Sequence, residues 1–380
     1  MSQLPEGFIP VMLTPFTPTG QVDFQGLVRL TDMYIQVGAK GLFANCLSSE
    51  MYELSVQERL DVVKTVVETA AGRVPVVATG TIEGSMEQMA DFSKKLHVLG
   101  VEAVIVLNNM LTQEYELDAI FLERMHQFMD LTPGVPLGIY ECPVPYKRLI
   151  TVEILEDLLP TGRLVYHKDT SLDIEQVRAR VKAGAGYNFG LYDAYMGHAL
   201  LSLQAGAKGL SCIQGNLFPD LIVWLCTHFN DVGKSAQVAK VQAFFADNME
   251  VMHTSYPTAA KYVLQKTGFD IDLYTRRDVG ELTDAMKADL DLLIEASKKA
   301  PGKITYTSSG TFGTNHLIPE GLAKEAGVKW NHIPSQGSGP AITATLGGHI
   351  NMASTAVAPA APHIKAGTLR PLAAYGNKRL

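Results

Sequence analysis

The chain has 380 residues, and hydrophobic residues make up 47% of it, enough for a large core that needs no disulfide or metal to hold it together. Its formal charge is -7 with no long basic run, so neither nucleic acid nor a membrane surface is an expected partner. The four cysteines lack paired C-x-x-C spacing and no apolar run reaches a membrane span, so we expect a cytoplasmic protein with reduced thiols.

Short apolar runs of strand character recur along the first 300 residues, with helical patterns between them. The expected strands are 8–16, 41–46, 74–80, 103–108, 137–141, 164–170, 187–192 and 209–215. The first clear helix, over 55–70, opens with the capping box Ser55-x-x-Glu58. Repeated strand-helix units of this kind predict an α/β fold, a (β/α)8 TIM barrel rather than an open doubly wound sheet.

Further helical stretches follow the eighth unit, at 235–253, 259–267 and 278–298, and predict a helical appendix packed on the barrel. No Gly-rich dinucleotide fingerprint follows the first strand. The motifs therefore support no cofactor and no metal.

Lys168 ends the sixth expected strand, after which the chain changes abruptly to turn residues. In a barrel the C-terminal ends of the strands carry the chemistry, and two-residue alternation puts Leu164, Tyr166 and Lys168 on the inner face. A lysine there is a candidate nucleophile if desolvation or a cationic neighbour lowers its pKa. The alternative is a surface lysine whose stem lies along apolar surface.

Tyr140 ends the neighbouring fifth strand at the same level, and it is the candidate partner of Lys168. An ordinary half-buried tyrosine with a satisfied hydroxyl is the alternative interpretation. After the second strand, Ser48, Ser49 and Glu50 form a polar cluster whose hydroxyls and amides could hold a carboxylate, although a turn that caps the next helix would look the same.

Three motifs stand out in order along residues 1–300, namely Leu13-Thr14-Pro15-Phe16, Tyr140-Glu141-Cys142-Pro143 and Lys168-Asp169-Thr170-Ser171, with related runs at 46–54, 72–78 and 206–211. In these the chain resembles the dihydrodipicolinate synthase / N-acetylneuraminate lyase family, class I aldolase-type barrels that bind 2-oxo acids through a lysine Schiff base. The resemblance implies that Lys168 is the Schiff-base lysine and Tyr140 the proton-transfer phenol. It implies that Ser48 and Ser49 bind the substrate carboxylate and that Ser211 contributes a backbone contact. It also favours a homodimer or homotetramer.

Two departures from the family pattern narrow the expected activity. Leu47 stands where the family usually has a threonine that links the tyrosine to a relay, so proton transfer is expected to run through Ser48, water or substrate. Pro145 aligns with a substrate-binding arginine, although Lys147 and Arg148 follow closely and could supply a cation. These departures argue against dihydrodipicolinate synthesis itself.

The expectation is therefore another lyase or aldolase acting on pyruvate or a related 2-oxo acid. A catalytically weak or inactive carboxylate-binding barrel is the alternative.

The composition changes at Pro301. We expect residues 1–300 to form the barrel with its helical extension and residues 301–380 to form a small partial α/β segment. Strands are expected at 303–307, 328–333, 350–354 and 369–375, with helices at 315–326, 340–346 and 358–366. The glycine-rich turn at 308–316 could bind a carboxylate at a helix N-terminus or could merely start the helix. His316 in this turn is expected to be a structural or surface histidine.

The runs 308–316, 332–334, 337–341, 347–349 and 362–367 give this segment a resemblance to part of the second lobe of the solute-binding proteins of tripartite tricarboxylate transporters. Because only part of such a periplasmic-binding-protein-like clamshell is represented, we assign it no ligand and expect apolar surface to be exposed there. A regulatory fusion, a vestigial tail and an erroneous gene join are all compatible with this pattern.

Overall fold

The computed structural model describes residues 4–298, 304–325 and 330–373. The chain divides into two compact units, Met1–Ile294 and Glu295–Leu380. Each unit is described by itself.

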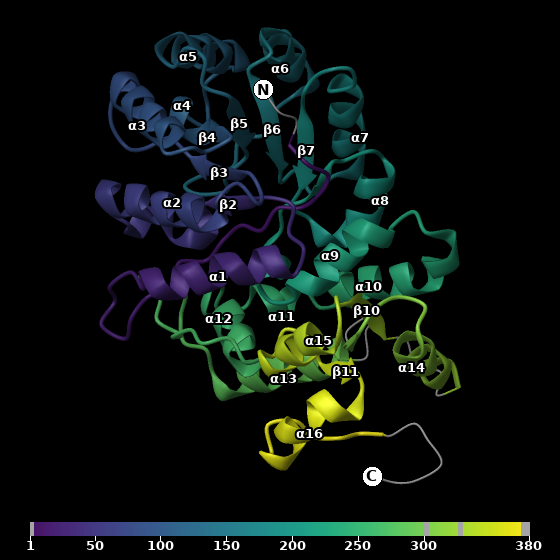
Figure 1. The fold of residues 1–380 in the computed structure, drawn as a ribbon. Helices are drawn as coiled ribbons and strands as arrows, with labels where there is room; N and C mark the ends of the chain where they lie inside the picture. Colours follow the sequence, from purple (N-terminus) through teal and green to yellow (C-terminus); the bar gives the residue numbers. More distant parts are fainter. Residues whose placement is uncertain (1–3, 299–303, 326–329, 374–380) are drawn as a thin grey trace. The chain divides into compact units, whose positions relative to one another are not determined.

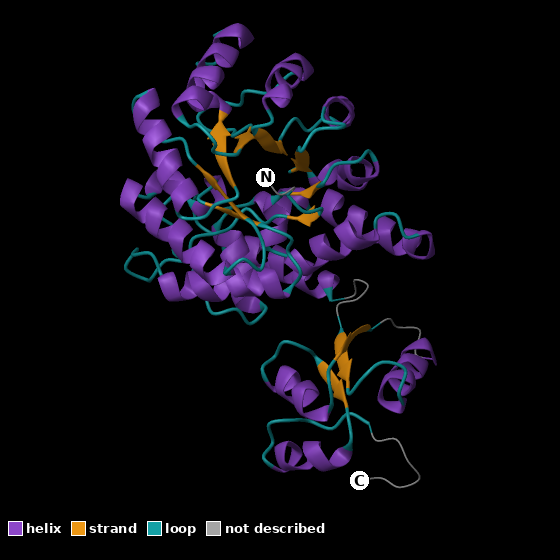
Figure 2. Cartoon of the chain, turned by 45° about the horizontal axis from the view of Figure 1, so that its top comes forward, coloured by secondary structure: helices purple, strands orange, loops and turns teal. Residues whose placement is uncertain are grey.

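The first unit is a ring of eight parallel strands surrounded by helices, the TIM barrel expected from the sequence (Figures 1 and 2). The strands are β1 Gly7–Phe8, β2 Leu42–Ala44, β3 Val76–Thr79, β4 Ala103–Leu107, β5 Leu137–Tyr140, β6 Leu164–Asp169, β7 Gly190–Asp193 and β8 Gly209–Leu210. From β2 to β8 each strand pairs with the next, and β8 pairs with β1. A parallel bridge between Val11 and Phe43 completes the ring between the first and second strands.

Each of these strands lies inside or within one residue of its expected range, but β1 and β8 are far shorter than 8–16 and 209–215. Pro10 and Pro15 in the first range lack the N–H group that a strand ladder needs. The eighth range bends instead into the 3-10 helix Ile213–Asn216. At the closure, a Cβ on Gly209 would stand 1.7 Å from the carbonyl oxygen of Gly7, so only glycine permits this pairing.

Helices cover the outer face of the ring in the order expected for alternating units (Figure 1). They are α1 Phe24–Gln36, α2 Val56–Ala70, α3 Met86–Val98, α4 Asn108–Leu111, α5 Asp118–Leu131, α6 Val152–Leu158, α7 Ile174–Ala183, α8 Ala199–Gln204 and α9 Pro219–His228. The predicted capping box is present, because Ser55 accepts from the backbone of Glu58 and the Glu58 carboxylate accepts from the backbone of Ser55.

The appendix consists of α10 Ser235–Asp247, α11 Met249–His253, α12 Thr258–Lys266 and α13 Asp284–Ser297. Helix α13 crosses the boundary between the two compact units. Among the described residues, no helix is both long and apolar enough to cross a membrane.

Aromatic rings fill the barrel interior at the level of the strand ends. Tyr166 stacks on Tyr192 with 4.9 Å between ring centroids, and Phe43 makes edge contacts with Tyr140 and Tyr166, each at 5.9 Å. Such offset and edge arrangements are the favoured geometries for buried aromatic pairs. They form a packed floor under the residues that end β5 and β6.

The second unit contains a three-stranded parallel sheet in the order β10-β9-β11, with β9 Thr305–Ser308, β10 Asn331–Pro334 and β11 Met352–Ser354. Its helices are α14 Thr314–Glu325, α15 Ser338–Leu346 and α16 Val357–Lys365. The prediction of a strand over 369–375 is wrong for residues 369–373, which contain no strand. Residues 374 and 375 lie outside the described residues.

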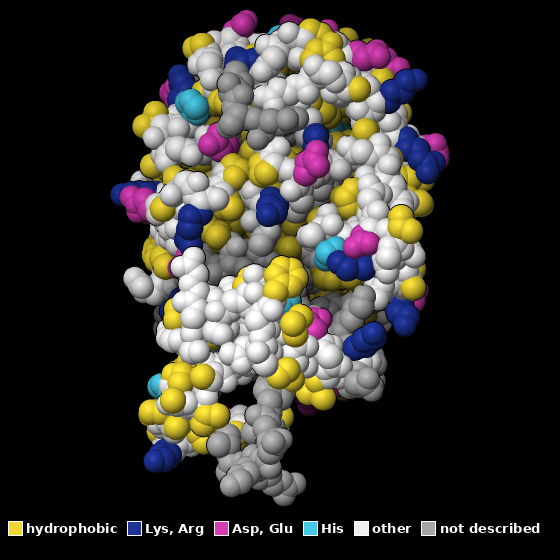
Figure 3. Space-filling model, turned by 45° about the vertical axis from the view of Figure 1, so that its right-hand side comes forward, with side chains coloured by type: hydrophobic (Ala, Val, Ile, Leu, Met, Phe, Trp, Pro, Cys, Tyr) yellow, Lys and Arg dark blue, Asp and Glu magenta, His cyan; other side chains and the backbone are white. Residues whose placement is uncertain are grey.

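Large apolar side chains are exposed on this unit, as expected for part of a larger fold (Figure 3). Phe312 is 79% exposed, Leu317 55% and Val357 48%. His316 stacks against His332 with 4.0 Å between ring centroids, and its Nδ1 accepts from the backbone of Phe312. These contacts give His316 a local structural role in the turn.

Candidate active site

The amine of Lys168 points into the barrel over the aromatic floor. Its strand pairs Lys168 with Tyr140 on one side and with Tyr192 on the other. The nitrogen lies 4.1 Å from the ring centroid of Tyr140 and 5.9 Å from that of Phe43, and the side chain is only 4% exposed. The inner-face position expected from strand alternation is the one observed, and the surface-lysine alternative does not fit.

Burial lowers the pKa of Lys168, and the nearby thiols of Cys46, Cys142 and Cys212 oppose this shift only in part. A lowered pKa increases the fraction of neutral amine at physiological pH. The residue therefore has the property that a nucleophilic lysine needs, without a cationic neighbour to produce it.

Tyr140 is buried beside this amine, and burial raises the pKa of its phenol well above the usual value. The thiol of Cys142, the second residue after it in the chain, adds to this increase of the pKa. At neutral pH the phenol is protonated, so it stands ready as an acid rather than as a base.

Ser48 and Ser49 lie together in the 3-10 helix Leu47–Ser49, and both are buried. The Ser49 hydroxyl donates to the carbonyl of Met12 at 2.7 Å and accepts from the backbone of Cys46 at 3.0 Å. Burial raises the pKa of Tyr256 in the appendix, and the neighbouring Ser48 side chain opposes that shift. The Ser49 side chain thus holds the loop in place, while Ser48 faces a tyrosine that the sequence did not bring to attention.

Glu50 anchors this loop to the appendix. Its carboxylate lies 3.2 Å from the amine of Lys261 and accepts from the backbone of Arg276 at 2.6 Å and of Arg277 at 2.9 Å. Glu50 and Lys261 are fully buried, and burial lowers the pKa of Lys261 while Glu50 opposes that shift. Glu50 is therefore a buried structural anchor, and its lysine partner 211 residues later had no signal in the local sequence.

Ser211 follows β8 and joins three strands. Its hydroxyl donates to the carbonyl of Ile9 at 2.9 Å and accepts from Tyr166 at 3.0 Å, and its backbone N–H donates to Asp193 at 2.8 Å. These bonds support the floor below Lys168. The backbone contact near the pocket that the family resemblance implies for Ser211 remains a prediction.

The two cations after Pro145 have different surroundings. Arg148 is buried, and its guanidinium bonds to the carboxylate of Asp118 at 2.6 Å. Lys147 is exposed, and its amine donates to the carbonyl of Thr170 at 2.8 Å, two residues beyond Lys168. Of the two, Lys147 is the cation at the barrel mouth.

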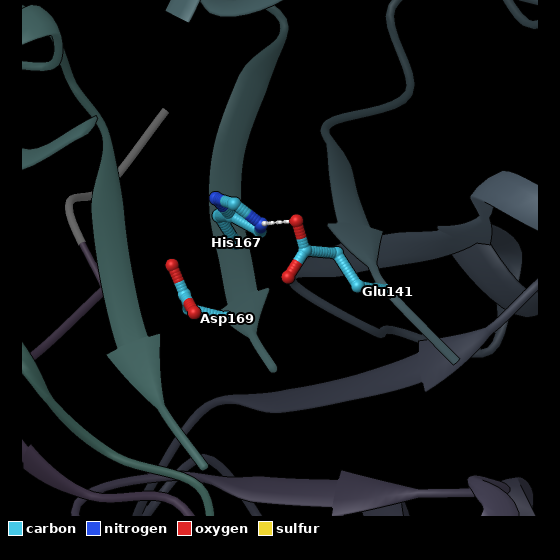
Figure 4. Close-up of side chains that lie close together, drawn as sticks. All are labelled: Glu141, His167 and Asp169. Atoms are coloured by element: carbon cyan, nitrogen blue, oxygen red, sulfur yellow. Dashed lines mark ion pairs between the residues drawn. The ribbon is translucent and has the colours of Figure 1, made fainter. Parts of the chain in front are cut away.

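Glu141, directly after β5, lies close to His167 and Asp169 of β6 (Figure 4). Two-residue alternation puts His167 and Asp169 on the face of β6 opposite to that of Lys168. One ligand atom from each falls within 4.8 Å of the others, which is the spacing of a metal site.

The cation at this position is instead a guanidinium. Arg180 of α7 lies 3.0 Å from Glu141 and 2.5 Å from Asp169. Burial opposes ionisation of Asp169, yet His167 and Arg180 hold its pKa below the usual value. The cluster does not fit a metal ion, because the arginine already neutralises its carboxylates; it ties α7 to the strand ends that carry Tyr140 and Lys168.

Two surface hollows lie elsewhere on this unit. One is lined by Val181, Phe189 and Lys208 near the start of β7 and β8, and the other lies between α2 and α3. Neither hollow contains Lys168 or Tyr140. The assignment of the candidate site is therefore based on the chemistry of its side chains and not on the shape of the surface.

Comparisons with known proteins agree with both resemblances read from the sequence. Residues 4–297 match the model of the dihydrodipicolinate synthetase family, and residues 282–380 match that of the tripartite tricarboxylate transporter family receptor. The second match begins within the appendix, ahead of the boundary between the compact units.

Among curated relatives, a 4-hydroxy-tetrahydrodipicolinate synthase of Laribacter hongkongensis is 26% identical over 301 residues, 77% of this chain and 98% of that protein. The putative 2-dehydro-3-deoxy-D-gluconate aldolase YagE of Escherichia coli is 24% identical over 306 residues, covering 78% of this chain and 98% of its own length.

Among solved structures, that of YagE in complex with pyruvate superimposes with a TM-score of 0.69 at 23% identity, covering 77% of this chain and 98% of that one. A dihydrodipicolinate synthase of Bacillus anthracis gives a TM-score of 0.71 at 20% identity over 78% and 99% of the two chains. At these identities the likeness concerns the fold.

Proposed function

Because the chain belongs to the dihydrodipicolinate synthetase family, we propose that it is a Schiff-base-forming lyase of the class I aldolase type, acting on pyruvate or another 2-oxo acid. The observation that carries this proposal is the buried amine of Lys168, 4.1 Å from the centroid of the Tyr140 ring at the C-terminal end of β6.

In the proposed reaction the neutral Lys168 nitrogen attacks the ketone carbon of the substrate. The former ketone oxygen takes one proton from the nitrogen and a second from water or Tyr140 and leaves as water, and the iminium that remains draws electrons from the adjacent carbon. When a carbon–carbon bond to that carbon breaks, the electron pair remains as an enamine, so no free carbanion forms. In an elimination the enamine forms by loss of a proton from that carbon, and its electrons then expel an oxygen leaving group from the next carbon. The lowered pKa of Lys168 supports the first step, since only the unprotonated amine can attack.

Tyr140 is the proposed proton-transfer group, and its pairing opposite Lys168 on the next strand supports that role. Ser48 and Ser49 are proposed to bind the 2-oxo acid carboxylate with the loop that carries them, and Ser211 to add a backbone contact. Because the Ser49 hydroxyl bonds to Met12, its contribution would come from holding the loop in shape.

Dihydrodipicolinate synthesis itself is not the proposed reaction. Leu47 and Pro145 replace a relay hydroxyl and a substrate-binding cation, while the relatives include a putative sugar-acid aldolase as well as synthases. Lys147 at the mouth favours a substrate with a second anionic group. The protein is proposed to work in the cytoplasm as a homodimer or homotetramer, with residues 1–300 as the catalytic barrel and 301–380 as a partial solute-binding-protein lobe.

A catalytically weak or inactive carboxylate-binding barrel is the second candidate. The loss of the hydroxyl at Leu47 and the commitment of the Ser49 hydroxyl to Met12 favour it, because both reduce the polar groups open to a reacting substrate.

Borohydride trapping separates the two candidates. The protein is incubated with pyruvate, reduced, and its mass measured. A stable adduct is expected in the natural protein and in Lys64→Ala, which changes an exposed lysine on α2, and no adduct in Lys168→Ala. Absence of an adduct with pyruvate and with other 2-oxo acids, together with calorimetric binding of the same acids, would establish the binding candidate instead.

A further inference from the structure

We infer that the buried ion pair between Glu50 and Lys261 positions the loop of Ser48 and Ser49 for binding the carboxylate of a 2-oxo acid. Lys261 belongs to helix α12, so the inference makes the appendix part of the substrate-binding machinery. It deepens the proposed function and rests on it, because it needs Schiff-base formation at Lys168.

The loop changes direction at Glu50. This residue has φ 57° and ψ 42°, in the left-handed region that a side chain other than glycine seldom adopts. Such a conformation persists only where the surrounding structure holds it. Glu50 joins the 3-10 helices Leu47–Ser49 and Met51–Glu53, so its backbone sets the direction of the two serines before it. Contacts that fix Glu50 therefore also help to fix Ser48 and Ser49.

Both carboxylate oxygens of Glu50 are held by the appendix. Oε1 lies 3.2 Å from the amine of Lys261, and Oε2 accepts from the backbone N–H groups of Arg276 at 2.6 Å and Arg277 at 2.9 Å. The Lys261 amine also donates to the carbonyl of Tyr274 at 2.6 Å. Glu50 and Lys261 are fully buried, so the carboxylate cannot turn away without leaving a charge unpaired.

A second set of hydrogen bonds holds the loop from the side of the barrel. The Thr14 hydroxyl donates to the carbonyl of Ser49 at 2.7 Å, and the Ser49 hydroxyl donates to the carbonyl of Met12 at the same distance. These bonds fix one side of the loop to the segment after β1, while Glu50 fixes the other side to the appendix. The loop thus depends on both attachments for its shape.

The ion pair should act on substrate binding and not on the reacting groups. Leu47, the first residue of the loop, packs against the buried cluster that contains Tyr140, so the loop borders the site. Lys168 and Tyr140 are register partners on β6 and β5, and strand pairing holds them independently of the appendix. Loss of the ion pair should therefore weaken binding of the carboxylate while the amine keeps its reactivity.

A comparison of pyruvate with pyruvamide reports this role. Both have the ketone that Lys168 attacks, but only pyruvate has a carboxylate. Borohydride trapping at increasing concentration gives a half-saturating concentration and a maximal rate for each compound. In Lys261→Met the half-saturating concentration of pyruvate is expected to rise roughly 10-fold or more, the equivalent of one hydrogen bond to a charged group. The half-saturating concentration of pyruvamide and both maximal rates are expected to stay near their natural values.

Glu50→Asp tests the same pair without leaving a buried charge unpaired, which matters because Lys261→Met leaves the Glu50 carboxylate without its cation. The shorter side chain cannot reach Lys261 and both backbone N–H groups together, so the half-saturating concentration of pyruvate is expected to rise here too. Lys266→Met is the matched control, because Lys266 is an exposed lysine on the same helix, beside Asp291. Natural values are expected for it with both compounds.

Natural half-saturating concentrations of pyruvate in Lys261→Met and Glu50→Asp would overturn the positioning role and leave the proposed function standing. Equal losses for pyruvate and pyruvamide would do the same, because they would show a general disturbance of the barrel. No adduct with pyruvate in the natural protein would overturn the proposed function, and the positioning role with it.

Discussion

The amine of Lys168 stands 4.1 Å from the centroid of the Tyr140 ring, and the two residues are register partners on neighbouring strands. The amine therefore packs against the face of the phenol ring. This geometry separates two contributions of Tyr140, one from the ring and one from the hydroxyl.

Tyr140→Phe keeps the ring and removes the hydroxyl. We expect adduct formation with pyruvate to be largely retained and proton exchange at the pyruvate methyl group to fall by about 100-fold or more, because the acid is lost while the floor below Lys168 is preserved. Trapping and exchange are measured on the same preparation. Natural exchange rates in this variant would remove the acid role of Tyr140.

The rate of adduct formation should depend on pH through Lys168. Burial lowers the pKa of this amine, and only the neutral form attacks, so the trapping rate should rise as pH increases through that lowered pKa and then level off. The plateau should begin below the usual pKa of lysine, which is near ~10.4. A trapping rate that still climbs at pH 10 would contradict the lowered pKa.

Arg180→Met should destabilise the barrel, because it leaves the carboxylates of Glu141 and Asp169 buried without their cation. Breaking a buried ion pair of this kind costs about 3–5 kcal/mol of unfolding free energy. Urea unfolding at pH 7 measures this loss of unfolding free energy. The control is Arg178→Met, which removes an exposed arginine beside Glu175 on the same helix and should change stability by less than about 1 kcal/mol.

The ion pair between Arg180 and Asp169 also predicts that the stability of the barrel depends on pH. The pKa of Asp169 is lowered in the folded state, so its contribution is present above the unfolded pKa and is lost as pH falls through the folded one. The stability gap between the natural protein and Arg180→Met should therefore narrow in acid. A gap that stays constant as pH falls well below 4 would show that packing, and not charge, explains the effect.

The C-terminal unit should be cleaved before the barrel in limited proteolysis. It exposes Phe312, Leu317 and Val357, and its sheet has three short strands, so its local unfolding free energy should be small. Mass spectrometry of the fragments should show cuts within 301–380 while a barrel fragment of about 300 residues persists. Equal resistance of the two regions would show that the C-terminal unit is a complete, stable domain.

The sequence by itself determined the barrel, its helical appendix and the position of Lys168 and Tyr140 at the C-terminal ends of neighbouring strands. Strand spacing and two-residue alternation are local properties, and together they predict the inner face and the C-terminal strand end for Lys168. The short β1 and β8 were not predicted, because prolines and a tight closure at Gly209 decide where pairing stops.

Only the tertiary structure decided the partners of the site residues. Glu50 meets Lys261 and Ser48 meets Tyr256 across more than 200 residues of chain, while Tyr52 reaches Cys142 across 90. Such contacts depend on how loops and appendix pack, and no periodicity or spacing in one sequence encodes them. The sequence identified a candidate reactive amine and its neighbour; the fold determined which groups hold them in place.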